Sequence, residues 1–308
     1  WAHYSAPPFS AAAIASGDEH MDSVSFGQDG MENEYLKVTF CKDGSISGIY
    51  DKVNQRETIR DTANVLRVYR DTEDAWDMDM DYARRPADRF ELVSAETYID
   101  GPKVVCRQSY RYNQSSLTQE VSLTAGGKLL AFDTEIDWHE KSKMLRTSFP
   151  VAVQAEEATC NIQFGSIRRP THTNTSWDLA KYEVCAHKWV DISEEGYGVA
   201  LLNDCKYGHK VQGCVLDLNL LRSTSHPGIE ADQGRHSFSY ALYPHGGDWD
   251  GAQLERIGME FNIKPVVYEN ASSKIGTFLR CDQPNIVIDT IKKCEDSDDI
   301  IVRMYESA

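Results

Sequence analysis

The sequence predicts an all-β protein, built as a large antiparallel β-sandwich with a small β-domain after it. Apolar and polar residues alternate in many short segments, which is the period of a half-buried strand. Gly, Pro, Asn and Asp separate these segments at short intervals, as they do in chains with many tight turns. No segment sustains an apolar i, i+3, i+4 stripe over three helical turns. Since each sheet has one apolar face to bury, we expect the sheets to pack face to face.

The first strands form a predicted hairpin, because residues 33–40 alternate, Lys42, Asp43 and Gly44 make a turn, and residues 45–50 return. The same pattern recurs along the chain. Residues 258–265 resemble a closing strand that ends at a proline. The other expected strands are 65–69, 89–93, 104–112, 116–124, 129–138, 144–150, 159–164, 197–202, 215–221 and 237–243.

Two domains are expected, a large sandwich over residues 27–265 and a small, truncated β-domain over residues 266–308. The small domain contains three short predicted strands, at 276–279, 286–292 and 300–305. A unit of this size buries too little apolar surface for an independent core, so we expect it to dock on the sandwich.

The charge balance excludes some classes of partner. The chain has 308 residues, with 32 Lys and Arg against 48 Asp and Glu, and a net charge of −16. Such a charge repels nucleic acids and anionic membrane surfaces, so neither is an expected partner. No run approaches the roughly 18 apolar residues of a membrane span, and the first residues lack the basic region of a signal peptide.

The eight cysteines are irregularly spaced and form no CxxC pair. Several lie in apolar, strand-like runs, which favours reduced and buried thiols over disulfides. This usage predicts a cytoplasmic location.

The stretch AWDMDMDY at residues 75–82 contains three alternating aspartates, the spacing that begins a calcium-binding EF-hand loop. Such a loop needs glycine at its sixth position, where this chain has Tyr82. A strand explains the spacing without a metal, since it would place Trp76, Met78, Met80 and Tyr82 on one face.

Polar and aromatic residues concentrate in three loop-like segments: RRPTHTNTSWDLAKYEVCAHKW at 168–189, LLNDCKYG at 201–208 and ADQGRHSFSYALYPH at 231–245. Sugar binding needs this mixture, because an aromatic ring packs against the C–H face of a pyranose while polar groups bond its hydroxyls. Ion pairs, core packing and turn capping remain alternative roles for these residues. The candidate substrate-binding residues are Arg169, His172, Asn174, Trp177, Asp178, Asp204, Lys206, Tyr207, Asp232 and His236.

The histidines show no HxH, HxxxH or HExxH spacing, and no phosphate-binding loop or GxSxG elbow is present. We therefore predict no catalytic residue and no metal ligand within this chain.

The three segments closely resemble the C-terminal half of glycoside hydrolase family 38 α-mannosidases, in the subgroup that contains the cytosolic and vacuolar enzymes. The resemblance covers nearly the whole chain. It implies a supersandwich like that of galactose mutarotase, and a retaining enzyme that hydrolyses terminal α-mannosidic bonds of oligosaccharides. In this family a zinc ion and the catalytic carboxylates belong to an N-terminal region.

By this resemblance, residues 1–26 are a linker from a missing N-terminal catalytic domain, and that domain and a mannose-containing oligosaccharide are the expected partners. The candidate residues would wall the substrate cleft. Zinc would belong to the full-length enzyme, this chain would hold no cofactor, and it would be inactive alone. Association into homo-oligomers is left open.

Two other functions remain. A stand-alone carbohydrate-binding sandwich would bind mannose without a catalytic partner, whereas half of a cleft would not. A mutarotase-like epimerase would need a His and Glu acid–base pair on one concave face.

Overall fold

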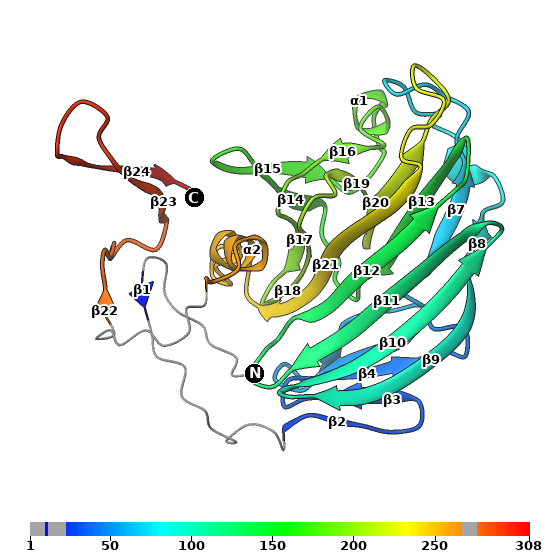
Figure 1. Cartoon of the computed structure of the whole chain (residues 1–308), viewed down its shortest axis with the longest axis horizontal. Helices are drawn as coiled ribbons and strands as arrows, with labels where there is room; N and C mark the ends of the chain where they lie inside the picture. The colour runs from blue at the N-terminus through cyan, green and yellow to red at the C-terminus, as the bar shows by residue number, and fades with distance from the viewer. Residues whose placement is uncertain (1–9, 12–22, 267–275) are drawn as a thin grey trace.

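The computed structural model describes residues 10–11, 23–266 and 276–308, and the features below belong to these residues. Its dominant elements are antiparallel sheets, which confirms the predicted all-β class and the sandwich architecture (Figure 1). The predicted hairpin is also confirmed: β4 (Leu36–Phe40) pairs with β5 (Ile46–Asp51) through a turn at Gly44, where φ is +83°.

The largest sheet has nine strands in the order β15-β14-β17-β18-β21-β12-β11-β10-β9. Its long central strand, β21, pairs with β12 on one side and with β18 on the other. Three of its strands differ from expectation: β9 continues to Asp100, and β15 and β17 were missed. The strands are β9 (Glu91–Asp100), β10 (Lys103–Tyr112), β11 (Ser115–Thr124), β12 (Leu130–Trp138), β14 (Glu157–Ile162), β15 (Gly165–Pro170), β17 (Trp189–Glu194), β18 (Tyr197–Asn203) and β21 (Gly234–Gly246).

Two smaller sheets form the opposite layer, one of six strands (β16-β19-β20-β13-β7-β8) and one of five (β2-β3-β4-β5-β6). In Figure 1, β2–β4 lie towards the lower edge and β7, β13 and β20 towards the upper right. The six strands are β7 (Arg67–Arg70), β8 (Asp88–Arg89), β13 (Lys143–Pro150), β16 (Val184–Cys185), β19 (Gly208–Gln212) and β20 (Val215–Ser223). The others are β2 (Ser25–Phe26), β3 (Gly30–Glu32) and β6 (Arg56–Glu57), with β4 and β5.

One apolar core fills the space between the layers. At its centre Phe132 stacks on Tyr240, with ring centroids 4.8 Å apart, and Phe149 meets Phe132 edge-on. Buried polar groups also link the layers, since the Tyr240 hydroxyl donates to Asn64 Oδ1 at 2.6 Å and Asn64 Nδ2 donates to Gln119 Oε1 at 2.7 Å. A fully bonded network of this kind fixes the register of the layers without leaving an unpaired dipole.

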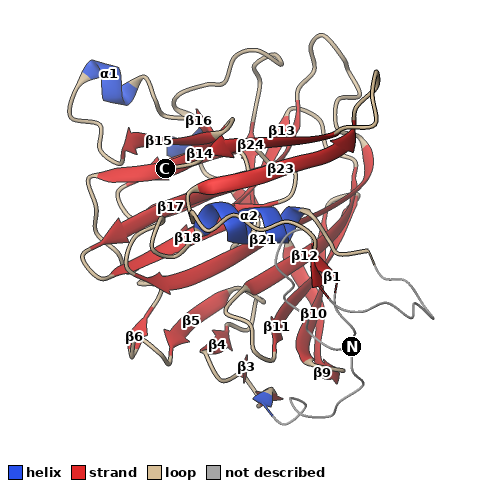
Figure 2. Cartoon of the chain, turned by 90° about the vertical axis from the view of Figure 1, so that its left-hand side faces the viewer, coloured by secondary structure: helices blue, strands red, loops and turns tan. Residues whose placement is uncertain are grey.

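The strand expected at 258–265 is wrong, because helix α2 (Leu254–Asn262) occupies most of this segment. Leu254, Ile257 and Phe261 follow helical spacing and pack with Trp189 on the outer face of the nine-stranded sheet. A Cβ at Gly258 would lie 2.8 Å from Trp189 Cδ1, so glycine permits the close approach. Figure 2 shows α2 lying across β17, β18 and β21.

The strand expected at 75–82 is also wrong. Asp74 Oδ1 accepts the amide hydrogens of Trp76 and Asp77, and these bonds fold the backbone into turns. The segment ends in the 3₁₀ helix η2 (Tyr82–Arg84). Trp76 is 72% exposed whereas Tyr82 is buried, so the two do not share a face.

The C-terminal segment contains a hairpin of β23 (Ile286–Lys293) and β24 (Ile300–Glu306). The third strand expected here, β22 (Gly276–Thr277), instead pairs with β1 (Ser10–Ala11), which lies in the predicted linker. The hairpin contacts the sandwich through Tyr305, whose hydroxyl donates to Glu255 Oε1 at 2.6 Å and whose ring meets Phe164 at 5.2 Å. The domain boundaries proposed from the sequence stay a prediction.

No helix in the described part of the chain has the length and apolar character of a membrane span. All eight cysteines are unpaired, but only Cys106 and Cys160 are buried, whereas Cys185 and Cys205 are exposed. The prediction of buried thiols is therefore wrong for most of them.

Cys294 is expected to be alkylated before Cys205. Hydrogen bonds from Ser297 and nearby amides lower the pKa of Cys294, whereas partial burial and the Asp204 carboxylate raise the pKa of Cys205 to about 11. Since the thiolate is the nucleophile, the difference between the two alkylation rates should narrow as the pH rises towards 11. Peptide mass spectrometry after timed iodoacetamide treatment measures both rates, and equal rates near neutral pH would contradict this prediction.

Thiol titration in denaturant without reductant should recover all eight cysteines.

Candidate functional site

The loop between β18 and β19 carries Asp204, Lys206 and Tyr207, and buried Asn203 holds it in place. Asn203 Oδ1 accepts the Lys206 amide hydrogen at 2.7 Å, and its Nδ2 donates to the His187 carbonyl at 2.7 Å. His209 lies beside Asn203, and burial lowers the pKa of its imidazole to about 3, so the ring stays neutral. A rigid polar base therefore supports the loop.

Asp204 extends the pairing between β18 and β21, because its amide donates to the Ser239 carbonyl and its Oδ2 accepts the Ser239 amide hydrogen at 2.9 Å. Its other oxygen, Oδ1, is buried, and the side chain lies beside the Cys205 thiol. Lys206 places its ammonium 4.5 Å from the centre of the Phe238 ring, a cation–π contact. A carboxylate and an ammonium thus lie on one short loop.

Tyr207 is half-exposed, and its ring lies 5.2 Å from that of His187. The backbone keeps the two side by side, since the Ala186 amide donates to the Tyr207 carbonyl at 3.1 Å. This pair gives the loop an accessible aromatic surface next to Lys206.

Arg169 reaches this region from β15, at the edge of the nine-stranded sheet. Its Nη2 donates to the Cys185 carbonyl at 3.3 Å, and Cys185 pairs with Gly208, which follows Tyr207. Its Nε is buried and has no hydrogen-bond acceptor among the described residues. Arg169 thereby joins the two layers beside the β18–β19 loop.

The short helix α1 (Ser176–Leu179) contains Trp177 and Asp178, and the loop before it carries His172 and Asn174. Thr175 caps this helix, because its Oγ1 accepts the Asp178 amide hydrogen at 3.2 Å. In return, Asp178 Oδ2 accepts from the Thr175 hydroxyl at 2.7 Å and from the Thr175 amide at 3.1 Å. The hydroxyl bond from Thr175 lowers the pKa of Asp178. His172 Nδ1 lies 3.5 Å from Asp178 Oδ2, and Trp177 is 81% exposed.

Asp232 and His236 lie where β21 begins. His236 Nε2 is 2.9 Å from the Asp232 carbonyl oxygen, and Asp232 Oδ2 accepts the Arg222 amide hydrogen. His236 and Phe238 share a face of β21, since strand side chains alternate. Ser239, which binds Asp204, is roughly 10 Å along the strand from His236.

The structure therefore brings Arg169 together with the β18–β19 loop and places Asp232 and His236 farther along β21. The α1 segment is connected to β21 indirectly, through the loop that follows β7. Tyr182, just after α1, donates its hydroxyl hydrogen to the Met78 carbonyl in this loop, and Arg222 bonds Asp71 in the same loop. Figure 1 shows α1 at the same end as the loops that follow β7 and β20. The role of these residues as sugar contacts stays a prediction.

Sequence reasoning missed a buried ionic cluster on β13 and β20 that anchors these loops. Arg146 donates to Asp217 Oδ1 at 2.5 Å and to Glu183 Oε2 at 3.0 Å, and its guanidinium lies 5.2 Å from the Tyr82 ring. The Tyr82 hydroxyl donates to Glu183 Oε1 at 2.6 Å. Burial raises the pKa of Glu183, although Arg146 opposes the shift. The sequence does show charged residues inside apolar strands here, which would have indicated this cluster.

The described residues contain no group of three or more His, Cys, Asp or Glu side chains arranged to hold a metal ion. They therefore do not fit a zinc site of their own. What the arrangement offers is binding chemistry: exposed aromatic rings at Trp177 and Tyr207 beside charged groups that donate and accept hydrogen bonds.

Comparison with known proteins gives consistent results. The model of the glycosyl hydrolases family 38 C-terminal domain matches residues 31–230, and that of the family 38 C-terminal beta sandwich domain matches residues 285–308. Human alpha-mannosidase 2C1 is 37% identical over 90% of this chain, and Dictyostelium discoideum alpha-mannosidase G is 33% identical over 98%. A solved alpha-mannosidase from Enterococcus faecalis shares the fold, with a TM-score of 0.77 and 16% identity over 91% of this chain and 36% of its own.

The chain spans only 28% of the human relative and 29% of the Dictyostelium one. Within that span, the first family model alone covers more than half of the chain and includes Arg169, the α1 segment and the β18–β19 loop. The chain belongs to the C-terminal domain family of the family 38 glycosyl hydrolases.

Proposed function

We propose that this chain acts within a longer polypeptide, a retaining, zinc-dependent α-mannosidase that hydrolyses terminal α-mannosidic bonds of oligosaccharides. In this proposal the β18–β19 loop, Arg169, the α1 segment and the start of β21 form one wall of the substrate cleft. The zinc ion and catalytic carboxylates come from another region, and the enzyme is cytoplasmic. The observation that carries the proposal is the exposed polar and aromatic surface of these loops in a member of this family.

Each group has a task in such a wall. Tyr207 and Trp177 offer ring faces to the C–H surface of a sugar, and Lys206 offers a donor for its hydroxyls. Asp204 fixes the loop to β21 through the Ser239 amide. Arg169 and Asn203 hold the loop in one conformation before the substrate arrives, which lowers the entropic cost of binding. No proton transfer is assigned to these residues.

Substituting the wall residues is expected to lower kcat/KM for an aryl α-mannoside about tenfold in the complete enzyme, with zinc content unchanged. Trp177→Ala removes an exposed ring, and Asp204→Asn removes a charge while keeping an acceptor for the Ser239 amide. Steady-state kinetics and metal analysis measure the two effects.

The matched control is Glu96→Ala, which removes an exposed carboxylate from β9, at the far edge of the same sheet. Wild-type kinetics for both wall variants would refute the cleft-wall role, as would turnover by the isolated chain. A loss of zinc in either variant would show a structural role instead.

A stand-alone carbohydrate-binding sandwich is the second candidate, and the exposed rings of Trp177 and Tyr207 favour it. Under this hypothesis, the isolated chain binds a mannoside at these loops without any catalytic partner. Under the cleft-wall hypothesis, the same loops bind too weakly to detect alone.

A further inference from the structure

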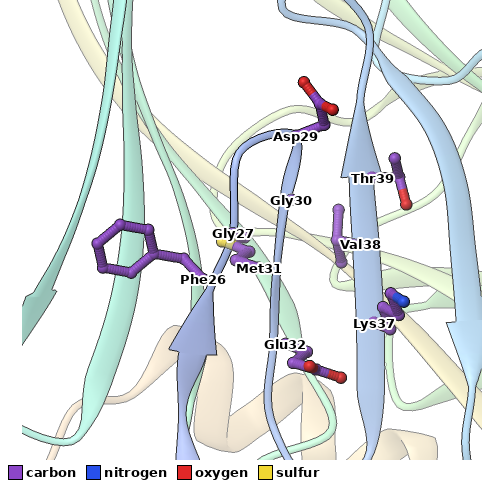
Figure 3. A pocket seen from close by; sticks show the side chains of 9 residues that line it. All are labelled: Phe26, Gly27, Asp29, Gly30, Met31, Glu32, Lys37, Val38 and Thr39. Carbon is purple, nitrogen blue, oxygen red and sulfur yellow. The ribbon is translucent and has the colours of Figure 1, made fainter.

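The outward face of the five-stranded sheet carries a shallow groove that the candidate site does not use. Two adjoining cavities, of about 350 and 440 Å³, share Lys37 and Thr39. The first extends to Phe26 on β2, and the second to Tyr50 on β5 and Glu57 on β6. Figure 3 shows the first cavity from close by. From β2 to β5 the groove crosses three strand spacings, or about 14 Å.

Backbone forms the floor of this groove, because two glycines flank Thr39 across the sheet. Gly30 on β3 lies opposite Thr39, and Thr39 lies opposite Gly48 on β5. A Cβ at Gly30 would meet the Val38 carbonyl oxygen at 2.3 Å, so local packing requires glycine there. Gly48 differs: a Cβ there would meet nothing closer than Glu57 Oε2 at 3.7 Å. The space above Gly48 is therefore open although a side chain would fit.

Polar side chains surround this space, and several have free hydrogen-bonding capacity. The neighbouring row across the sheet is Glu32, Lys37, Tyr50 and Glu57. Glu32 forms a salt bridge with Lys52 at 2.6 Å. By contrast, none of the side chains of Lys37, Thr39, Tyr50 and Glu57 makes a hydrogen bond or salt bridge with any residue that the structure describes. Tyr50 is 37% exposed and Phe26 is 48% exposed.

We propose that this groove is a binding site for a neutral carbohydrate. Two lysines, Lys37 and Lys52, face three acidic residues, Asp29, Glu32 and Glu57, so charges of both signs line the groove and little net charge is left to select an ion. Sugar hydroxyls both donate and accept, which suits the free Glu57 carboxylate and Lys37 ammonium. The Tyr50 ring offers a face for the C–H surface of a pyranose, and the open floor at Gly48 admits the ring beside it.

The test uses mannotriose and the isolated chain, with binding followed by saturation-transfer NMR. The wild-type chain is expected to bind, and Tyr50→Ala and Gly48→Val should each weaken binding about tenfold. Gly48→Val fills the floor with a residue that favours strands, so the fold should survive. Val93→Ala, an exposed apolar truncation on β9, should bind as the wild type does. Trp177→Ala is measured beside it to test whether the sugar binds at the α1 segment instead.

Failure of the wild-type chain to bind mannotriose would overturn the proposal. So would wild-type affinity in both groove variants, or a loss of binding confined to Trp177→Ala, which would place the sugar on the α1 segment. If circular dichroism shows that Gly48→Val is unfolded, Gly48→Ala decides, since a single Cβ fits at 3.7 Å. The groove lies on a different sheet from the proposed cleft wall, so either proposal can fail without the other.

Discussion

Arg146→Ala is expected to lower the free energy of unfolding by about 3–5 kcal/mol, the cost of removing one partner of a buried ion pair. Arg146 is 1% exposed and is bonded to both Asp217 and Glu183. Its removal leaves two mostly buried carboxylates without a cation and removes the ring contact with Tyr82. Urea unfolding followed by circular dichroism measures the change.

Arg146→Lys is the matched control. It keeps the charge but cannot bond both carboxylates with a planar fork, so we expect an intermediate loss. A change within about 1 kcal/mol for Arg146→Ala, typical of a surface substitution, would show that the cluster contributes little.

The pH dependence of this variant has a definite sign. Burial raises the pKa of Glu183 above its ordinary value of 4.5, and Arg146 is the main group that opposes the rise. Without Arg146 the pKa rises further, so the folded state holds the proton more tightly than the unfolded state does. The loss of stability should therefore be smallest in acid and grow as the pH rises through the pKa of folded Glu183. A deficit that does not change with pH would contradict this account.

Glu255→Ala is expected to cost a similar amount, about 3–5 kcal/mol. Glu255 is 6% exposed and accepts from four donors: Tyr305 OH at 2.6 Å, Asn161 Nδ2 at 2.7 Å, Lys188 Nζ at 3.1 Å and Trp189 Nε1 at 3.3 Å. Alanine would leave the buried Trp189 Nε1 unpaired, and Asn161 Nδ2 would keep only its bond to the Gly165 carbonyl. Thermal and urea unfolding measure the loss.

Two further variants separate the parts of this effect. Glu255→Gln keeps a carbonyl acceptor and should cost less than alanine, whereas Tyr305→Phe removes one bond, worth about 1 kcal/mol. Hydrogen exchange should rise in β23 and β24 alone for Tyr305→Phe, and in α2 as well for Glu255→Ala. Wild-type exchange in the hairpin of both variants would show that Glu255 does not hold it.

The sequence predicted the sandwich because alternation is a local property that each strand carries by itself. The strands expected at 258–265 and 75–82 are wrong because the local sequence pattern there differs from the structure that the surrounding residues impose. Residues 258–265 alone show no helical stripe, because the apolar stripe of helix α2 begins at Leu254. The aspartates near Trp76 alternate as a strand would, yet their side chains capture backbone amides and form turns.

The candidate site was predictable only in part, for a physical reason. Polar residues in turns such as that of Asp204 are visible in the sequence, but their partners depend on strand pairing between distant segments. Arg146 is a charge inside a largely apolar strand, a signal from which no prediction was made, and nothing local identifies Glu183 as its partner. Arg169 reaches Cys185 across two sheets, a contact that no spacing rule predicts.

The central place of β21 has a consequence for the order in which the protein can be made. On the ribosome, β9–β12 are complete by Trp138, but the free side of β12 is the side that β21 covers. Until Gly246 has been synthesised, β12 remains an exposed edge strand able to pair with other chains. Nascent protein should therefore need protection by chaperones over this interval, and a chain that terminates within it should aggregate rather than fold.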